Sequence, residues 1–185
     1  KSHCIHNMIS QMNALPTPPE MILFDPKRCE FGRYKDRYRV IEDLEDAKRV
    51  LFEELFENEI IGKRWSSDKD RSPLVIIIDE LLDLIFMHKS KSSKYVSDRN
   101  RYEAIIKILD IGPELNIFTI ISTQSSDKDI LTKKILDNCQ TRLAFRAINA
   151  QDSRRILKKP GAEDLLGRVE AILYQEGKCQ KIQCH

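Results

Sequence analysis

Two adjacent carboxylates, Asp79 and Glu80, stand directly after an uninterrupted apolar run at residues 74–78. Five apolar residues without alternation are typical of a strand buried on both faces, as in a parallel sheet covered by helices. Ligands of such sheets bind at the carboxyl ends of the strands. An acid there suits Mg²⁺ on nucleotide phosphates, and a second acid suits the activation of water. The alternative is that Asp79 only caps a helix that begins near Leu81.

Lys1 and Ser2 open the chain, ahead of a predicted helix at residues 2–13. They match the end of a G-x-x-x-x-G-K-[ST] phosphate loop, in which the Lys reaches the β- and γ-phosphates of a nucleotide and the hydroxyl ligates Mg²⁺. A Lys-Ser pair is a weak motif, and its position before a helix gives it weight. The glycines of this motif would precede Lys1, so the sequence predicts a fragment that begins inside the phosphate loop and is inactive alone.

A second predicted buried strand, Ile-Phe-Thr-Ile-Ile at residues 117–121, is followed by Ser122, Thr123 and Gln124. If the strands at 74–78 and 117–121 are neighbours, the amide of Gln124 emerges beside the two acids. An amide can hydrogen-bond a phosphate oxygen or a water molecule and so report whether the γ-phosphate is present. The alternative is an ordinary polar strand end.

The remaining pattern alternates short apolar runs with helical periodicity, which predicts an α/β fold with a mostly parallel sheet flanked by helices on both faces. One predicted helix places Leu44, Ala47, Leu51 and Leu55 on one face, and another begins at Tyr102 and ends at Gly112-Pro113. The serine-rich basic stretch at 88–101 predicts a loop. The other predicted elements are strands at 21–25, 39–41, 141–145 and 178–185 and a helix at 129–136.

Length and composition limit the function classes. The 185 residues, of which 41% are hydrophobic, indicate one domain with a sizeable core. With 31 basic and 29 acidic residues the net charge is +2, so any nucleic-acid surface must be local. Five dispersed cysteines, without C-x-x-C spacing, indicate reduced thiols in a cytosolic setting. No apolar run approaches the roughly 20 residues of a membrane helix, so we expect any anchor to lie outside these residues.

The chain resembles the motor domain of the FtsK/SpoIIIE family of DNA translocases, within the FtsK/HerA group of RecA-like P-loop ATPases. The resemblance rests on an ordered set of segments: MILFDPKRC at 21–29, LVIIIDELLD at 74–83, IFTIISTQ at 117–124, TRLAF at 141–145, DSRRIL at 152–157 and GAEDLLG at 161–167. It implies a homohexameric ring that uses ATP and Mg²⁺ to pump double-stranded DNA and is tethered to the inner face of a bacterial membrane. Similar proteins serve as coupling ATPases of conjugative elements and as substrate ATPases of type VII secretion.

The resemblance also implies roles for individual residues around the nucleotide. Lys1 and Ser2 match the phosphate-loop Lys and the Mg²⁺-ligating hydroxyl. Asp79 matches the metal-associated acid, Glu80 the catalytic base, and Gln124 the γ-phosphate sensor.

Further positions match the family beside the nucleotide and on its DNA-facing loops. Asp25-Pro26-Lys27 matches a D-P-K segment at the nucleotide site, where Lys27 could pair with Asp25 or with a phosphate; the alternative is that Pro26 only ends a strand. The basic residues of the expected DNA-facing region could contact phosphates without reading sequence, or could form an ordinary solvated helix face. They are Arg142, Arg146, Arg154, Arg155, Lys158 and Lys159.

Two segments depart from the family pattern. Pro113 stands where the family carries an Arg that acts on the neighbouring subunit's nucleotide, and an arginine finger contributes orders of magnitude to turnover. Arg99, Arg101, Arg142 and Arg154 are the replacements to test. The family's T-Q-R-P is Thr-Gln-Ser-Ser at residues 123–126, which removes a basic residue. Both changes favour a divergent translocase, closer to a mobile-element coupling protein.

Two functions remain open from the sequence. The preferred one is an ATP-driven motor that moves double-stranded DNA. The other is a degenerate nucleotide-binding scaffold, or a type VII secretion-type ATPase without DNA translocation. Because the chain also ends in a predicted strand cut short near residue 185, we expect these residues alone to be a weak monomer.

Overall fold

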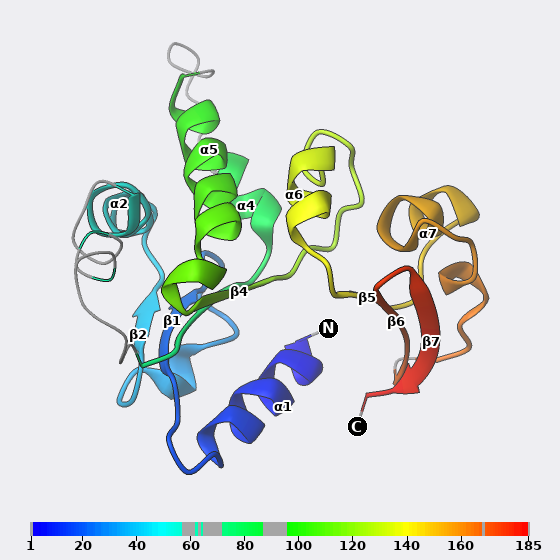
Figure 1. The fold of residues 1–185 in the computed structure, drawn as a ribbon, viewed down its shortest axis with the longest axis horizontal. Coiled ribbons are helices and arrows are strands. Elements are labelled where there is room, and N and C mark those ends of the chain that lie inside the picture. Colours follow the sequence, from blue (N-terminus) through cyan, green and yellow to red (C-terminus); the bar gives the residue numbers. More distant parts are fainter. Residues whose placement is uncertain are drawn as a thin grey trace. The chain divides into compact units, whose positions relative to one another are not determined.

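The computed structural model describes residues 2–56, 62, 64, 72–86, 96–167 and 169–184. The side chains of 44, 48, 52, 53, 56, 86 and 96–101 are not among the described parts. The chain forms two compact units, one of Pro16–Ser125 and one of Lys1–Leu15 with Ser126–His185 (Figure 1). Each unit has its own sheet.

A four-stranded parallel sheet forms the centre of the unit Pro16–Ser125, which confirms the predicted α/β class. Its strands are β1 (Glu20–Phe24), β2 (Arg39–Ile41), β3 (Leu74–Ile78) and β4 (Ile117–Ile121), in the order β2-β1-β3-β4. All three strand pairs are parallel, and Phe24, Ile78 and Ile121 align across the sheet. Every residue of β3 is buried. The carboxyl ends of β1, β3 and β4 therefore meet at one edge.

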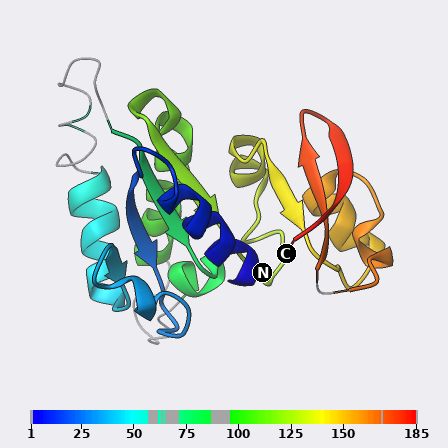
Figure 2. The same ribbon diagram turned by 90° about the horizontal axis from the view of Figure 1, so that it is seen from below.

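Helices flank this sheet. They are α2 (Leu44–Arg49), which continues into a π-helical segment (Val50–Phe56), α4 (Leu81–Phe86) and α5 (Val96–Ile111). Helix α2 begins where the Asp43 carboxylate accepts the backbone N–H of Glu45 at 2.8 Å, an N-cap. The predicted inward face is confirmed for Ala47, Leu51 and Leu55, which are buried; the side chain of Leu44 lies outside the described parts. Figure 2 shows α5 beside β4, against which it packs.

The predicted end of α5 at Gly112-Pro113 is confirmed, and the helix begins at Val96 rather than Tyr102. Of the predicted loop at 88–101, residues 88–95 lie outside the described residues. After Gly112 the chain makes one 3-10 turn, Pro113–Leu115, and Asn116 takes a left-handed backbone. The Ile117 N–H donates to the Gly112 carbonyl at 2.8 Å, so β4 begins directly after this turn.

The second unit contains an antiparallel sheet in the order β5-β6-β7. Strand β5 (Arg142–Ala144) pairs antiparallel with β6 (Glu170–Gln175), and β6 with β7 (Lys178–Gln183). Its helices are α1 (Ser2–Asn13), α6 (Lys133–Asn138) and α7 (Ala150–Leu157). The buried residues Ala144, Leu157, Ala162, Leu165 and Tyr174 form its core.

The sequence prediction for this region was right in part. The strand at 141–145 exists, but it does not extend the parallel alternation, because its partner β6 runs antiparallel to it. The predicted helix at 129–136 begins later, at Lys133. Strand β7 confirms the predicted strand near the chain end, whereas β6 and α7 were not predicted. None of the helices in the described parts is long and apolar enough to cross a membrane.

Gly112 is a position where only glycine fits. A Cβ added there would crowd the Ile108 carbonyl oxygen and lie 2.9 Å from the Ile117 carbonyl oxygen. Backbone cannot move aside as a flexible side chain can. We expect Gly112→Ala to lower the free energy of unfolding by about 1–3 kcal/mol, measured by urea denaturation.

Gly32→Ala is the matched control for this measurement, because nothing lies within 4 Å of a Cβ at Gly32. We expect the control to change stability by no more than about 0.5 kcal/mol. Equal effects at both positions would contradict the packing argument.

Candidate nucleotide site

Polar residues follow three neighbouring strands at the carboxyl edge of the parallel sheet. Backbone hydrogen bonds continue one residue past the strands: Asp79 N–H donates to the Phe24 carbonyl at 3.0 Å, and Ser122 N–H to the Ile78 carbonyl at 2.9 Å. Leu81 N–H then donates to the Ser122 carbonyl at 2.8 Å. The residues after β3 and β4 are therefore held side by side, as the sequence predicted for neighbouring strands.

Glu80 is held by the residues that follow β4. Its carboxylate accepts the Thr123 hydroxyl at 2.8 Å and the Gln124 backbone N–H at 2.9 Å. The side chain is buried, with Glu80 only 3% exposed. Its φ of 60° lies in the left-handed region, which disfavours a residue with a Cβ and is typical of positions that the surrounding structure constrains. Glu80 is thus fixed in both backbone and side chain.

Asp79 is buried beside it. The Ser122 hydroxyl donates to Asp79 Oδ1 at 3.1 Å. A buried carboxylate needs such donors, because an ionised group without a partner is costly to remove from water. The two acids therefore lie on adjacent residues at the end of an apolar strand.

Asp25 ends β1 and organises the loop behind it. Its carboxylate is fully buried and accepts the backbone N–H groups of Cys29 at 3.3 Å, Glu30 at 2.9 Å and Phe31 at 2.8 Å. These bonds fold residues 25–31 into a compact turn. Asp25 therefore shapes the loop that carries Lys27; contact with a nucleotide stays a prediction.

Lys27 pairs with Asp83 on α4, with Nζ 3.0 Å from Oδ2. The pairing with Asp25 considered from the sequence is therefore not the one formed. Hydrogen bonding to Asp83 raises the pKa of Lys27, and the negative charges of Glu80 and Asp79 act in the same direction. The ammonium group stays protonated at neutral pH and lies near both site acids.

Three further residues were predicted to bind the nucleotide or to sense its γ-phosphate. Lys1 lies outside the described residues, and Ser2 is the first residue of α1 in the other unit. Gln124 is exposed, and its backbone N–H binds Glu80. The sensor role of its side chain stays a prediction.

Arg142 does not suit the DNA-binding role predicted for it. It is 7% exposed, and its guanidinium donates to the carbonyl oxygens of Cys139 and Ile156, each at 2.9 Å, and of Leu136. The Cζ atom also lies 4.9 Å from the centre of the Tyr174 ring. With its donors used inside the fold, Arg142 is a structural residue that ties β5 to α6 and α7.

The other basic residues predicted to bind DNA lie around α7. Arg146 and Arg154 are exposed. Arg155 is half-buried and donates to the Ser126 carbonyl. The side chains of Arg99 and Arg101, named as replacements for the missing arginine, lie outside the described parts. Pro113 begins the 3-10 turn after α5.

Sequence reasoning treated Ser122 and Thr123 only as neighbours of Gln124 and assigned no role to Asp83. The signal for the first two was present, because aligning the parallel strands by their last apolar residue places Ser122 opposite Asp79 and Thr123 opposite Glu80. No sequence signal pairs Asp83 with Lys27, since 56 positions separate them by their residue numbers.

Comparison with known proteins shows which proteins this chain is similar to. No family model matches the chain. The DNA translocase FtsK of Leptospira interrogans is 31% identical over 199 residues, which cover 93% of this chain and 20% of the relative. The FtsK of Streptomyces avermitilis is 29% identical over 210 residues, which cover 96% of this chain and 22% of the relative. The FtsK of Oceanobacillus iheyensis is 29% identical over 206 residues, which cover 96% of this chain and 25% of the relative. The chain thus spans a fifth to a quarter of these relatives.

Solved structures share the fold. The conjugation coupling protein TcpA of pCW3, in a monomer form with ATPγS, superposes with a TM-score of 0.82 at 18% identity, covering 98% of this chain and 56% of TcpA. The cytoplasmic domain of the type VII secretion ATPase EccC of Thermomonospora curvata gives 0.67 at 16% identity, covering 90% and 21%. With the sequence relatives, these findings show that nearly the whole chain is homologous to a part of the FtsK DNA translocases and has the RecA-like P-loop ATPase fold.

Proposed function

We propose that this chain is the ATPase core of a motor that moves double-stranded DNA and works in a hexameric ring. The observation that carries the proposal is the buried Asp79-Glu80 pair, with Glu80 held by the end of the neighbouring parallel strand. The FtsK relatives, named as DNA translocases, support the DNA substrate. The proposal includes a cytoplasmic position and a membrane tether in the full protein.

The residues present suit ATP with Mg²⁺. Magnesium at nucleotide sites is typically held by one or two carboxylates together with phosphate oxygens and water, rather than by a full cage of side chains. Asp79, a buried acid at the carboxyl edge of the sheet, fits this donor set. The resemblance adds the Ser2 hydroxyl as a metal ligand and Lys1 as a phosphate ligand. When bound, ATP supplies the phosphoanhydride bond whose hydrolysis drives movement.

Glu80 is the general base in this proposal. A Glu Oε atom takes the proton of the attacking water, which requires the carboxylate to stay in one orientation. The Thr123 hydroxyl and the Gln124 N–H provide that orientation. The backbone N–H of Gln124 binds Glu80, and its side chain is exposed. A phosphate that accepts a hydrogen bond from the side-chain amide would therefore contact the same residue that holds the base.

Exposed arginines around α7 are the proposed DNA contacts. Arg146 and Arg154 present charge without a buried role, and Arg155 extends the group. We leave Arg142 out, because its guanidinium is used inside the fold. Contacts to phosphate give affinity without sequence preference.

The first prediction concerns the base. In the protein with a complete phosphate loop, Glu80→Gln keeps the shape of the side chain but removes its ability to take a proton. We expect DNA-stimulated ATP hydrolysis to fall by about 100-fold or more, while nucleotide binding is retained. Steady-state phosphate release and binding of a fluorescent ATP analogue measure the two effects.

Glu114→Gln, at an acid outside the site in the turn after α5, is the matched control and should leave hydrolysis unchanged. Nucleotide binding without hydrolysis by the wild-type assembly would contradict the motor and favour the scaffold. Wild-type activity in Glu80→Gln would contradict the assignment of the base.

The second prediction concerns Thr123. Thr123→Val removes the hydroxyl that donates to Glu80 at similar volume, so we expect kcat to fall about tenfold with KM for ATP nearly unchanged. Thr123→Ser keeps the hydroxyl and should restore most of kcat. If Val and Ser variants lose activity equally, or if only KM changes, the hydroxyl does not position the base.

The third prediction concerns DNA. Arg154→Ala should weaken binding about equally for unrelated duplex sequences and reduce the slope of log affinity against log salt by about 0.9. Fluorescence anisotropy across a salt series measures both. Lys178→Ala, an exposed cation on β7, is the control. Unchanged affinity and slope for Arg154→Ala would remove this residue from the DNA interface.

A further inference from the structure

Lys27 and Asp83 form an ion pair at the carboxyl edge of the parallel sheet, with Lys27 Nζ 3.0 Å from Asp83 Oδ2. Lys27 lies in the loop that follows β1. Asp83 lies in the first turn of α4, where its backbone N–H donates to the Glu80 carbonyl at 3.1 Å. Because β1 and β3 pair directly, the segments that carry the two side chains leave the sheet side by side. The pair therefore belongs to the edge that carries the site acids.

Lys27 is held at both ends of its side chain. Its backbone is part of the turn that the Asp25 carboxylate organises through three backbone N–H groups. In this turn Arg28 N–H also donates to the Asp25 carbonyl at 3.0 Å, and Arg28 has a φ of 57°. Its ammonium group is held by Asp83. The side chain is nevertheless 46% exposed, so an anion at this edge can reach a cation whose position is fixed.

Asp83 depends on Lys27 for its partner. The Oδ2 atom of Asp83 is buried from water, and within the described parts of the chain Lys27 Nζ is its only polar contact. Stability is a weak explanation for the pair, because an ion pair with a half-exposed partner contributes little to it. The alternative role for an acid in the first turn of a helix is a favourable interaction with the helix dipole. That role does not require a lysine.

An ammonium group at this edge suits phosphate chemistry. Phosphoryl transfer depends mainly on positioning and on cations that stabilise the charge of the phosphoryl oxygens. A lysine carries a compact charge on a flexible stem, so a partner has to hold it, as a glutamate holds the lysine of protein kinases. Hydrogen bonding to Asp83 and the charges of Glu80 and Asp79 raise the pKa of Lys27. The held cation thus stays charged beside both site acids.

We propose that Asp83 is a positioning residue of the ATPase, which holds the Lys27 ammonium where the terminal phosphate of ATP carries its charge during hydrolysis. Asp83 does not contact the nucleotide and acts only through Lys27. The proposal rests on the proposed ATP hydrolysis, and it adds an ion pair to the Asp79-Glu80 site. Without Asp83, the flexible lysine side chain is free to turn away from the phosphate.

A double-mutant cycle in the protein with a complete phosphate loop tests this role. Asp83→Asn keeps the shape of the side chain and removes its charge, so we expect kcat to fall about tenfold with KM for ATP nearly unchanged. Lys27→Met should lower kcat at least as much. Asp83→Asn should then cause no further loss in the Lys27→Met background, because Asp83 acts through Lys27. Asp83→Glu keeps the carboxylate and should restore most of kcat.

Chemical labelling of Lys27 tests the position of the ammonium group without turnover. Acetic anhydride reacts with the neutral amine, and mass spectrometry of the digested protein gives the rate at Lys27. Asp83→Asn should raise this rate at least about threefold, because the amine loses the partner that keeps it protonated. Mg²⁺ with ATPγS should lower the rate in the wild type, because the terminal phosphate then contacts the ammonium group.

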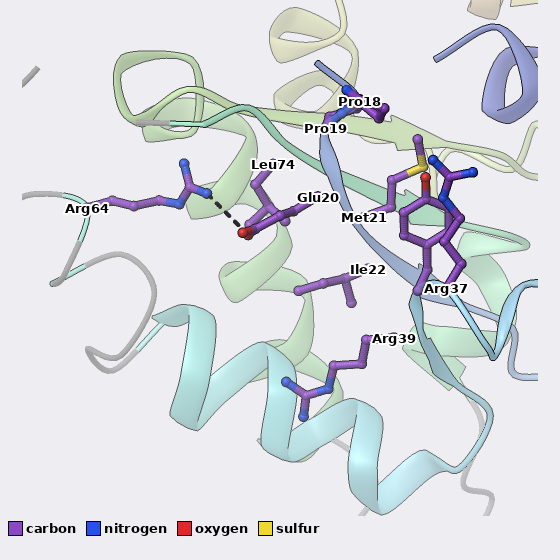
Figure 3. A pocket seen from close by; sticks show the side chains of 10 residues that line it. Pro18, Pro19, Glu20, Met21, Ile22, Arg37, Arg39, Arg64 and Leu74 are labelled. Atoms are coloured by element: carbon purple, nitrogen blue, oxygen red, sulfur yellow. Dashed lines mark ion pairs between the residues drawn. The ribbon is translucent and has the colours of Figure 1, made fainter. Parts of the chain in front are cut away.

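Glu20→Gln is the matched control, because it breaks an ion pair at the opposite edge of the same sheet. Glu20 begins β1, beside a cavity of about 650 Å³, and its Oε2 atom lies 3.9 Å from Arg64 Nη2 (Figure 3). The control should change neither kcat nor the labelling of Lys27.

Three outcomes would overturn the positioning role and leave the proposed function intact. They are wild-type kcat in Asp83→Asn, an equal loss of kcat from Asp83→Asn whether residue 27 is Lys or Met, and labelling of Lys27 that Mg²⁺ with ATPγS does not change. The second outcome is the one expected if Asp83 only supports the start of α4. A wild-type assembly that does not hydrolyse ATP would instead overturn the proposed function, and the positioning role with it.

Discussion

The hydrogen bonds between the Glu80 carboxylate and the Thr123-Gln124 segment are the interaction on which the candidate site depends. An acid at the end of a fully buried strand is costly unless donors meet it. Those donors follow β4 in the chain, and β4 must pair with β3 in one register for Ser122 to reach Asp79 and Thr123 to reach Glu80. A shift by one residue would turn every side chain of the strand to the other face. Packing and chemistry therefore require the same register.

This constraint explains why one part of the fold could be predicted from the sequence. The apolar runs of β1, β3 and β4 lack alternation and are followed by polar residues, a local pattern that indicates parallel strands with a ligand edge. The end of α5 was also predicted from a local pattern, the Gly112-Pro113 pair. Crowding around Gly112 in addition excludes a side chain at that position. In these places short-range preference and tertiary packing agree.

Other features depend on contacts that no local pattern encodes. The strand predicted at 141–145 follows the parallel series in the sequence, yet its partner β6 lies nearly 30 residues later along the chain and runs antiparallel to it. Arg142 was predicted to bind DNA together with neighbouring basic residues. In the structure its guanidinium instead donates to carbonyl groups of α6, of α7 and of Cys139, which follows α6. Lys27 pairs with Asp83, which lies on α4, the helix that begins directly after the site acids. The charge of a side chain follows from its residue type, whereas its ion-pair or hydrogen-bond partner depends on the fold.

We place the nucleotide chemistry at the carboxyl edge of the parallel sheet, where β1, β3 and β4 end. A crystal structure of the protein, with a complete phosphate loop, bound to Mn²⁺ and a non-hydrolysable ATP analogue tests the nucleotide site directly. We expect an anomalous peak within direct or single-water contact of an Asp79 oxygen, and the γ-phosphate facing Glu80 and Gln124. A metal and nucleotide bound away from the carboxyl ends of β1, β3 and β4 would contradict it.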